Sequence, residues 1–197
     1  MDGAACWLFI ASATALLGSP GPGIAALLAV GRAEGWGVLR FFAGLQVGLA
    51  LAFGATALGV LSFLKAVPFA ARAMALASAG YLIVLAYRIA TGPVGSTTQS
   101  PQTRSSATSG FMLGIANPKA YVACASLLAS QTLVEHDLRV DVLLKWLLCV
   151  MVAIIVDIAW MAVGVRLQRA GLRPRSERIL NITLAATIIM AAVFTLL

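Results

Sequence analysis

Charged residues are scarce in this sequence. Asp, Glu, Lys and Arg together make up 11% of its 197 residues, whereas an ordinary soluble domain carries roughly a quarter. Hydrophobic residues make up 61%, and the mean hydropathy is +0.97. This composition predicts an all-α integral membrane protein that contacts the lipid bilayer and has no separate soluble domain. The net charge of +7 does not indicate a nucleic-acid partner, because the basic residues lie between apolar segments, as topology signals do.

Cysteine, histidine and catalytic motifs are also nearly absent. Cys6, Cys124 and Cys149 are odd in number, far apart and in apolar surroundings, which indicates packing and no disulfide framework. The only histidine, His136, lies in a short predicted loop away from any second ligand cluster, so we expect no metal site and no cofactor. There is no phosphate-binding loop and no nucleophile elbow. We therefore interpret the protein as a non-enzyme.

Long apolar runs, by contrast, are abundant. A helix needs ~20 apolar residues to cross ~30 Å of hydrocarbon, and by this length six transmembrane helices are predicted. They cover residues 5–31, 38–64, 68–90, 110–133, 142–165 and 179–197.

The first span contains a helix-breaking cluster. Proline removes an amide donor and clashes with the preceding turn, and glycine lowers the cost of irregular backbone. Carbonyls freed in this way would each cost several kcal/mol in lipid, so the break is tolerated only against protein or a wet cavity. The cluster is therefore a candidate substrate site, made of Ser19, Pro20, Gly21, Pro22 and Gly23.

A second break suggests an internal repeat. Asn117, Pro118 and Lys119 interrupt the fourth span, and 118 − 20 = 98 is close to half the chain length. We predict two inverted three-helix repeats, residues 1–90 and 110–197, with interrupted first and fourth helices. Because each half has three spans, an odd number, the second half enters the membrane from the side opposite to the first. The Ser/Thr/Gln-rich residues 91–109 form a flexible cytoplasmic linker. Interrupted spans in matching positions indicate a transporter's binding site.

The basic residues predict the orientation. Nine fall on one side of the predicted spans and four on the other, which puts the first side in the cytoplasm and both termini outside. The Arg-rich loop of the first side would alternatively bind acidic partners or anionic head groups. The larger set is Arg32, Arg40, Arg88, Arg104, Arg166, Arg169, Arg173, Arg175 and Arg178, and the smaller is Lys65, Arg72, Arg139 and Lys145.

Each break also has the pattern of a helix start. In Asn117-Pro118, asparagine is the N-cap and proline the first helical residue, and Ser19-Pro20 has the same pattern. Two helix N-termini approaching from opposite faces would hold an anion such as a carboxylate, which favours an amino acid or organic acid as substrate. In the competing interpretation, Asn117 lies at the cytoplasmic interface and Lys119 is an ordinary snorkelling lysine.

Two polar residues lie inside the other spans. Asp157 is deep in the fifth span, where a carboxylate is costly and usually pairs, faces a cavity or relays protons. It is either the coupling protonation site or the partner of a substrate amine, unless it is a protonated, hydrogen-bonded structural residue. Gln46 lies between Gly44 and Gly48, a spacing that permits close helix packing, and either lines the substrate path or supplies an interhelical hydrogen bond.

The order and spacing of these motifs resemble the lysine exporter family, the LysE/RhtB-type efflux proteins. Residues 19–23 are similar to its Pro-Gly-Pro signature and residues 114–120 to its Asn-Pro-Lys motif. Residues 35–37 with 43–48, 79–88 and 178–181 resemble parts of its second, third and last spans, so the resemblance covers essentially the whole chain.

The resemblance implies a secondary active exporter of amino acids or amino-acid derivatives in the cytoplasmic (inner) membrane, often a homodimer. It assigns gate or site-forming roles to Pro20, Pro22, Asn117, Pro118 and Lys119. Many members carry another residue where this chain has Gly23, and some carry an acid where it has Leu49. The substrate and the coupling residue therefore stay open.

Three alternatives remain beside amino-acid export, one of which is a non-transporting assembly or accessory protein. A metal or inorganic ion exporter of related fold would need several membrane-embedded acids or histidines, and Asp157 alone gives it little support. A thiol-disulfide shuttle would use Cys6 and Cys124 in the first and fourth spans, although neither has a flanking proline.

Overall fold

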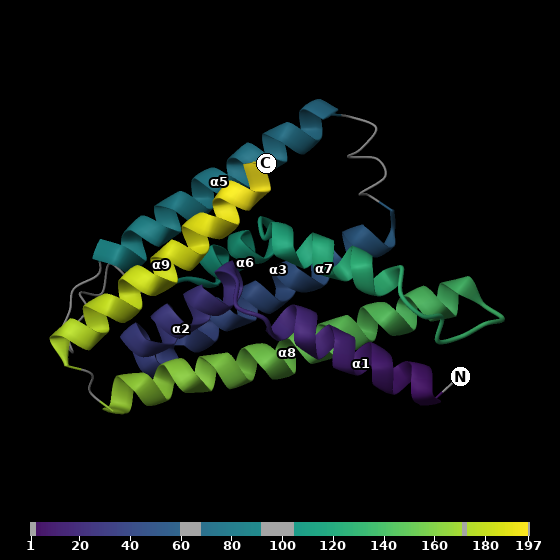
Figure 1. Ribbon diagram of the computed structural model, residues 1–197, viewed down its shortest axis with the longest axis horizontal. Helices are drawn as coiled ribbons and strands as arrows, with labels where there is room; N and C mark the ends of the chain where they lie inside the picture. Colours follow the sequence, from purple (N-terminus) through teal and green to yellow (C-terminus); the bar gives the residue numbers. More distant parts are fainter. Residues whose placement is uncertain (1–2, 60–67, 92–104, 171–172, 197) are drawn as a thin grey trace.

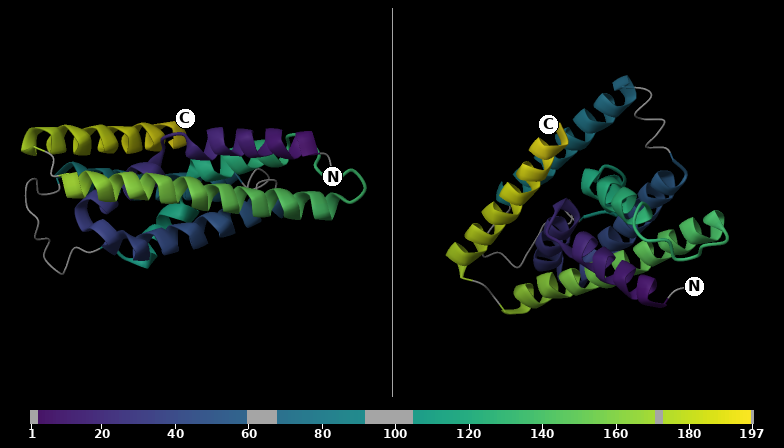
Figure 2. Two further views of the ribbon diagram at one scale, coloured as in Figure 1. Left: turned by 90° about the horizontal axis from the view of Figure 1, so that it is seen from below. Right: turned by 45° about the vertical axis from the view of Figure 1, so that its right-hand side comes forward.

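The computed structural model describes residues 3–59, 68–91, 105–170 and 173–196, and all the regular structure in these residues is helical. The helices share one long direction, so that the chain passes back and forth along it (Figures 1 and 2). In chain order they are α1 Gly3–Gly18, α2 Pro22–Glu34, the 3-10 turn η1 Gly35–Val38, α3 Leu39–Ala57, α5 Pro68–Thr91, α6 Ala107–Ile115, α7 Pro118–Leu128, α8 Leu138–Ala170 and α9 Pro174–Leu196.

Both predicted breaks are confirmed as breaks in the helices. The first separates α1 from α2, with Pro22 at the start of α2 and extended backbone at Gly21. The second lies at Ala116 and Asn117, where α6 and α7 meet at an angle of 53°. Proline begins the second helix of each pair, where its missing amide costs no hydrogen bond.

The helix after the first break is buried over most of its length. All ten residues from Pro22 to Gly31 are buried, and α2 packs against α8, α9 and η1. Small residues allow the close approach to α8, since a Cβ at Gly164 would lie 2.8 Å from the Leu28 carbonyl oxygen. The irregular backbone of the first break is covered in part, since Gly21 is buried, Ser19 is half-buried and Pro20 is exposed.

The glycines of α3 and α6 form the tightest helix contact. A Cβ at Gly44 would lie 1.8 Å from the Ala107 carbonyl oxygen, and one at Gly110 would lie 2.0 Å from that of Phe41. Gly48 and Gly114 are similarly close to the opposite backbone. The predicted close packing at Gly44 and Gly48 is therefore confirmed, with α6 as the partner.

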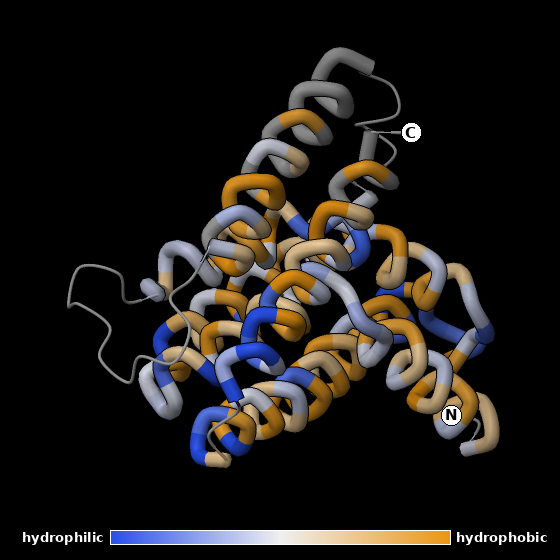
Figure 3. The backbone as a smooth tube through the Cα atoms, turned by 60° about the vertical axis from the view of Figure 1, so that its left-hand side comes forward, coloured by the Kyte–Doolittle hydropathy of each residue, from blue (hydrophilic) through white to orange (hydrophobic). Residues whose placement is uncertain are grey.

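Helices α5 and α9 lie side by side and reach the rest of the molecule mainly through α2 (Figures 1 and 3). At the start of α9, the Arg32 guanidinium of α2 binds Glu177 in an ion pair and donates a hydrogen bond to Asn181 Oδ1 at 2.6 Å. Arg178 donates to the Ala90 carbonyl of α5 at 2.8 Å. These contacts join the ends of α2, α5 and α9.

Several helices have the length and composition of membrane spans. Among the described residues, Pro22–Ala57 and Leu138–Ala170 qualify, and α6 with α7 is a third if the bent pair counts as one span. A positive φ of 56° at Gly35 interrupts the first of these stretches. With two or three such spans among the described residues, the chain is a multi-pass membrane protein, while the count of six spans stays a prediction.

Some predicted boundaries differ from those of the helices. The fourth predicted span reaches residue 133, but α7 ends at Leu128, because Asp141 of α8 accepts hydrogen bonds from the amides of Leu133 (2.6 Å) and Val134 (2.9 Å). The second predicted span reaches residue 64, and α3 ends at Ala57. The predicted linker falls largely on residues 92–104, outside the described residues.

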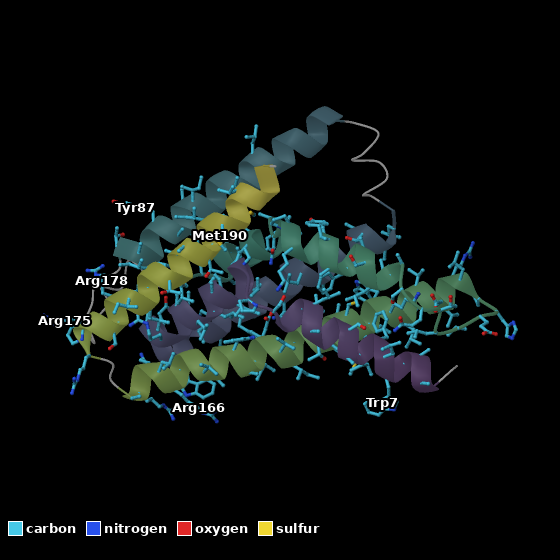
Figure 4. The ribbon with its side chains drawn as sticks, viewed as in Figure 1. Trp7, Tyr87, Arg166, Arg175, Arg178 and Met190 are labelled. Atoms are coloured by element: carbon cyan, nitrogen blue, oxygen red, sulfur yellow. The ribbon has the colours of Figure 1, made fainter. Side chains whose placement is uncertain are left out.

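The basic residues are divided along α8, whose 33 residues span about 50 Å. Arg139 lies in its first turn and Arg166 in its last part. Arg166, Arg175 and Arg178 appear together at one end of the molecule in Figure 4.

Candidate functional site

The two breaks meet at one cavity. Its volume is about 40 Å³, room for a few water molecules by the usual measure. Residues of both breaks line it together with residues of α3 and α8, which are far apart in the sequence. The lining residues are Leu17, Gly21, Gly23, Ile24, Leu49, Phe53, Asn117, Lys119, Ala120, Ala153 and Asp157.

Lys119 joins the second break to the first. Its Nζ donates a hydrogen bond to the Ser19 carbonyl oxygen, beyond the end of α1, where carbonyls lack helical partners. The lysine side chain crosses Gly21 so closely that a Cβ there would lie 2.8 Å from Lys119 Cδ. The glycine therefore provides the space that the ammonium needs to reach Ser19.

Asp157 is held at the cavity by Gln46. Gln46 Nε2 donates a 2.7 Å hydrogen bond to Asp157 Oδ2, which links α3 to α8. Asp157 is 6% exposed and lies on the buried face of α8 with Ala153 and Met161. The opposite charges of Asp157 and Lys119 attract each other across the cavity. Gln46 thus supplies an interhelical hydrogen bond, as one of its two interpretations predicts.

Asn117 occupies the N-cap position of α7 but does not cap it. Its side chain makes no hydrogen bond to the first turn, and its Oδ1 is buried without a partner. Its Nδ2 lies against the first break, 3.6 Å from where a Cβ of Gly23 would stand. The predicted helix start is confirmed, with Asn117 at the N-cap and Pro118 as the first helical residue, but the Asn117 side chain lines the cavity instead of capping the helix.

The remaining predicted residues shape the break without lining the cavity. The Ser19 hydroxyl donates to the Leu16 carbonyl at 2.9 Å, so it does not cap a helix start. Pro22 and Pro118 begin α2 and α7, and Pro20 is exposed.

Sequence reasoning missed Leu49, Phe53 and Trp160. Leu49 and Phe53 follow Gln46 by three and seven residues, the spacing of one helix face, and this signal would have found them. Trp160 follows Asp157 by three residues and donates from Nε1 to the Gly18 carbonyl at 3.3 Å, a second contact at the end of α1. No local pattern indicates that partner.

Metal binding would need clustered ligands, and thiol exchange would need paired cysteines. Among the described residues, no three His, Cys, Asp or Glu side chains lie together as metal ligands. All three cysteines are free, and the thiol of Cys124 interacts with that of Cys149 in α8. The Cys6–Cys124 disulfide that a thiol shuttle would form is not present in this structure.

The comparison with protein families gives one result. The family described as LysE type translocator matches residues 14–197. The matched region begins within α1 and includes both breaks and every residue that lines the cavity. No curated protein and no solved structure matches the chain.

Proposed function

Because the chain belongs to the LysE type translocator family, whose members are membrane transporters, we propose that it is a secondary active exporter of amino acids or amino-acid derivatives across the cytoplasmic membrane. The observation that carries the proposal is the meeting of two helix breaks at a cavity with one ammonium and one carboxylate, Lys119 and Asp157. In membrane transporters, interrupted helices in corresponding spans form the substrate site.

The proposed path runs through the cavity, with the breaks as its gates. In the structure, Lys119 bonds to Ser19 and so ties the α6–α7 break to the α1–α2 break. A substrate carboxylate would compete with the Ser19 carbonyl for the ammonium. Substrate binding would then weaken the hydrogen bond between Lys119 and Ser19, which joins the two halves of the chain. The states with and without substrate would thus differ in this contact, as a transport cycle requires.

The proposed topology has six spans in two inverted halves, with the Arg-rich end in the cytoplasm and both termini outside. The separation of Arg139 from Arg166 along α8 supports this orientation. An exporter must receive its substrate at the Arg-rich end, where Arg32, Glu177 and Asn181 join α2 to α9.

We assign Asp157 to coupling or to substrate binding. A carboxylate that is buried and accepts a hydrogen bond from the neutral amide of Gln46 is suited to gain and lose a proton during transport. The same carboxylate would bind a substrate amine. The two roles differ in their response to a proton gradient, which the Asp157→Asn variant tests.

Transport by purified protein in proteoliposomes is the direct test. We expect saturable movement of at least one labelled amino acid from a panel, and loss of that movement in the Pro20→Ala, Pro118→Ala double variant. Arg175→Gln, an exposed change at the far end of the molecule, is the control and should transport normally. Movement of inorganic ions without any amino acid would contradict the proposal.

A further inference from the structure

The charges of the side chains that line the cavity indicate which amino acids fit it. Its described lining contains one cationic side chain, Lys119, and one anionic side chain, Asp157, so its formal charge is balanced. A substrate with equal charges of both signs preserves that balance. A substrate with a net positive charge would leave an uncompensated cation in a nearly buried site, which is unfavourable.

The breaks provide a subsite for a carboxylate. Helices α2 and α7, of 13 and 11 residues, both begin at the cavity, and neither start has a side-chain cap. The first amides of a helix have no carbonyl partner within it and carry partial positive charge. Together with the Lys119 ammonium, these two helix starts favour an anionic group between them.

Asn117 indicates that the ligand also brings a hydrogen-bond donor. Its Oδ1 is buried without a partner beside the anion subsite, and the residue is 6% exposed. A carboxylate cannot satisfy this oxygen, because an ionised carboxylate only accepts hydrogen bonds. An ammonium group satisfies it and is also attracted by Asp157, which lines the same cavity.

The rest of the lining is apolar. Leu49 and Phe53 come from α3, Ala120 and Ala153 from α7 and α8, and Leu17 and Ile24 from the two helices at the first break. No further acid in this described lining would bind a basic side chain. The volume of the whole cavity, about 40 Å³, favours a small substrate over a large one.

We infer that the substrate is a small zwitterionic α-amino acid with an uncharged, apolar side chain. Its carboxylate binds Lys119 and the starts of α2 and α7, its ammonium binds Asn117 Oδ1 and Asp157, and its side chain contacts the apolar wall. The inference rests on the proposed transport function and narrows it to one class of amino acid.

The test compares molecules that differ by one group. Uptake of labelled valine is measured into proteoliposomes preloaded with unlabelled valine, isovalerate, isobutylamine or lysine as the exchange partner. Isovalerate lacks the amine of valine and isobutylamine lacks its carboxylate. We expect valine to support exchange and each of the other three to be at least tenfold weaker.

A variant of the wall gives a second readout. Leu49→Ala enlarges the apolar side, so it should improve the KM for leucine relative to that for valine by about tenfold, while Leu51→Ala, on the exposed face of the same helix, should not change the ratio. An unchanged ratio in Leu49→Ala would overturn the assignment of this wall to the side chain.

The outcomes separate this inference from the proposed function. Exchange of lysine or isovalerate as effective as that of valine would overturn the inference and leave amino-acid or organic-acid transport standing. No exchange of any amino acid in a broad panel would overturn both.

Discussion

At the scale of single residues, the site depends on two side chains whose positions their neighbours fix. Lys119 reaches Ser19 only because Gly21 has no Cβ in its way. Asp157 is oriented by the 2.7 Å hydrogen bond from Gln46. The sequence indicated all five of these residues, because polar or helix-breaking residues stand out in apolar runs. It did not indicate which of them touch, since their contacts join distant parts of the chain.

Gly21→Ala tests whether transport depends on the hydrogen bond between Lys119 and Ser19. The new methyl group would lie 2.8 Å from Lys119 Cδ, so the lysine must leave Ser19, and we expect transport to fall about tenfold. Gly80→Ala is the matched control, because a Cβ there meets nothing within 4 Å, and it should be neutral or stabilising by up to about 1 kcal/mol. Equal transport in both variants would refute the role of this hydrogen bond.

Asp157→Asn tests coupling. The amide keeps the shape of the carboxylate but cannot exchange a proton, so we expect export to lose its dependence on a pH gradient and its rate to fall at least tenfold. The measurement is efflux from vesicles with and without an imposed gradient. Glu135→Gln, in an exposed loop, should retain the gradient dependence. An unaltered rate and pH dependence in Asp157→Asn would remove Asp157 from the mechanism.

At the scale of helices, the glycine contact between α3 and α6 connects the two halves of the chain. Sequence reasoning identified the spacing of Gly44 with Gly48, because small residues four apart lie on one helix face. It did not identify Gly110 and Gly114 as their partners, since the register of two helices depends on tertiary packing. The same limit applies to Lys145, which was predicted as a topology signal and forms a buried 2.8 Å ion pair with Asp141.

Gly110→Ala should destabilise this contact. Its Cβ would lie 2.0 Å from the Phe41 carbonyl oxygen, and backbone cannot yield as a flexible side chain does. We expect a loss of roughly 1 to 3 kcal/mol, as for other overpacked sites, and a lower yield of folded protein. Thermal unfolding in detergent measures the effect, again with Gly80→Ala as control. Unfolding at the wild-type temperature would show that α3 and α6 are not packed so closely.

At the scale of the whole molecule, the helical class, both breaks and the division of basic residues along α8 followed from composition and hydropathy. The packing of α5 with α9, and the link from Arg32 to Glu177 and Asn181, did not. Apolar helices in a bilayer are similar on all faces, so hydropathy gives their number and length but not their neighbours. Arg32, expected only as a topology signal, also makes this tertiary contact.

The orientation is tested by labelling cysteines introduced in a Cys6→Ser background, since Cys124 and Cys149 are buried. A membrane-impermeant thiol reagent added to intact cells should label His136→Cys, near the start of α8. It should label Arg175→Cys, near the start of α9, only after the cells are permeabilised. The reverse pattern would show that the proposed topology is inverted, with the Arg-rich end outside the cell.

The burial of α2 against α8 has a consequence for the order of assembly during synthesis. The helix α8 begins at Leu138, more than a hundred residues after α2 ends at Glu34. Until α8 has been made, the backbone of the first break has no protein to cover it on that side, and lipid cannot satisfy its polar groups. The first break is therefore synthesised long before the helix that completes its surroundings.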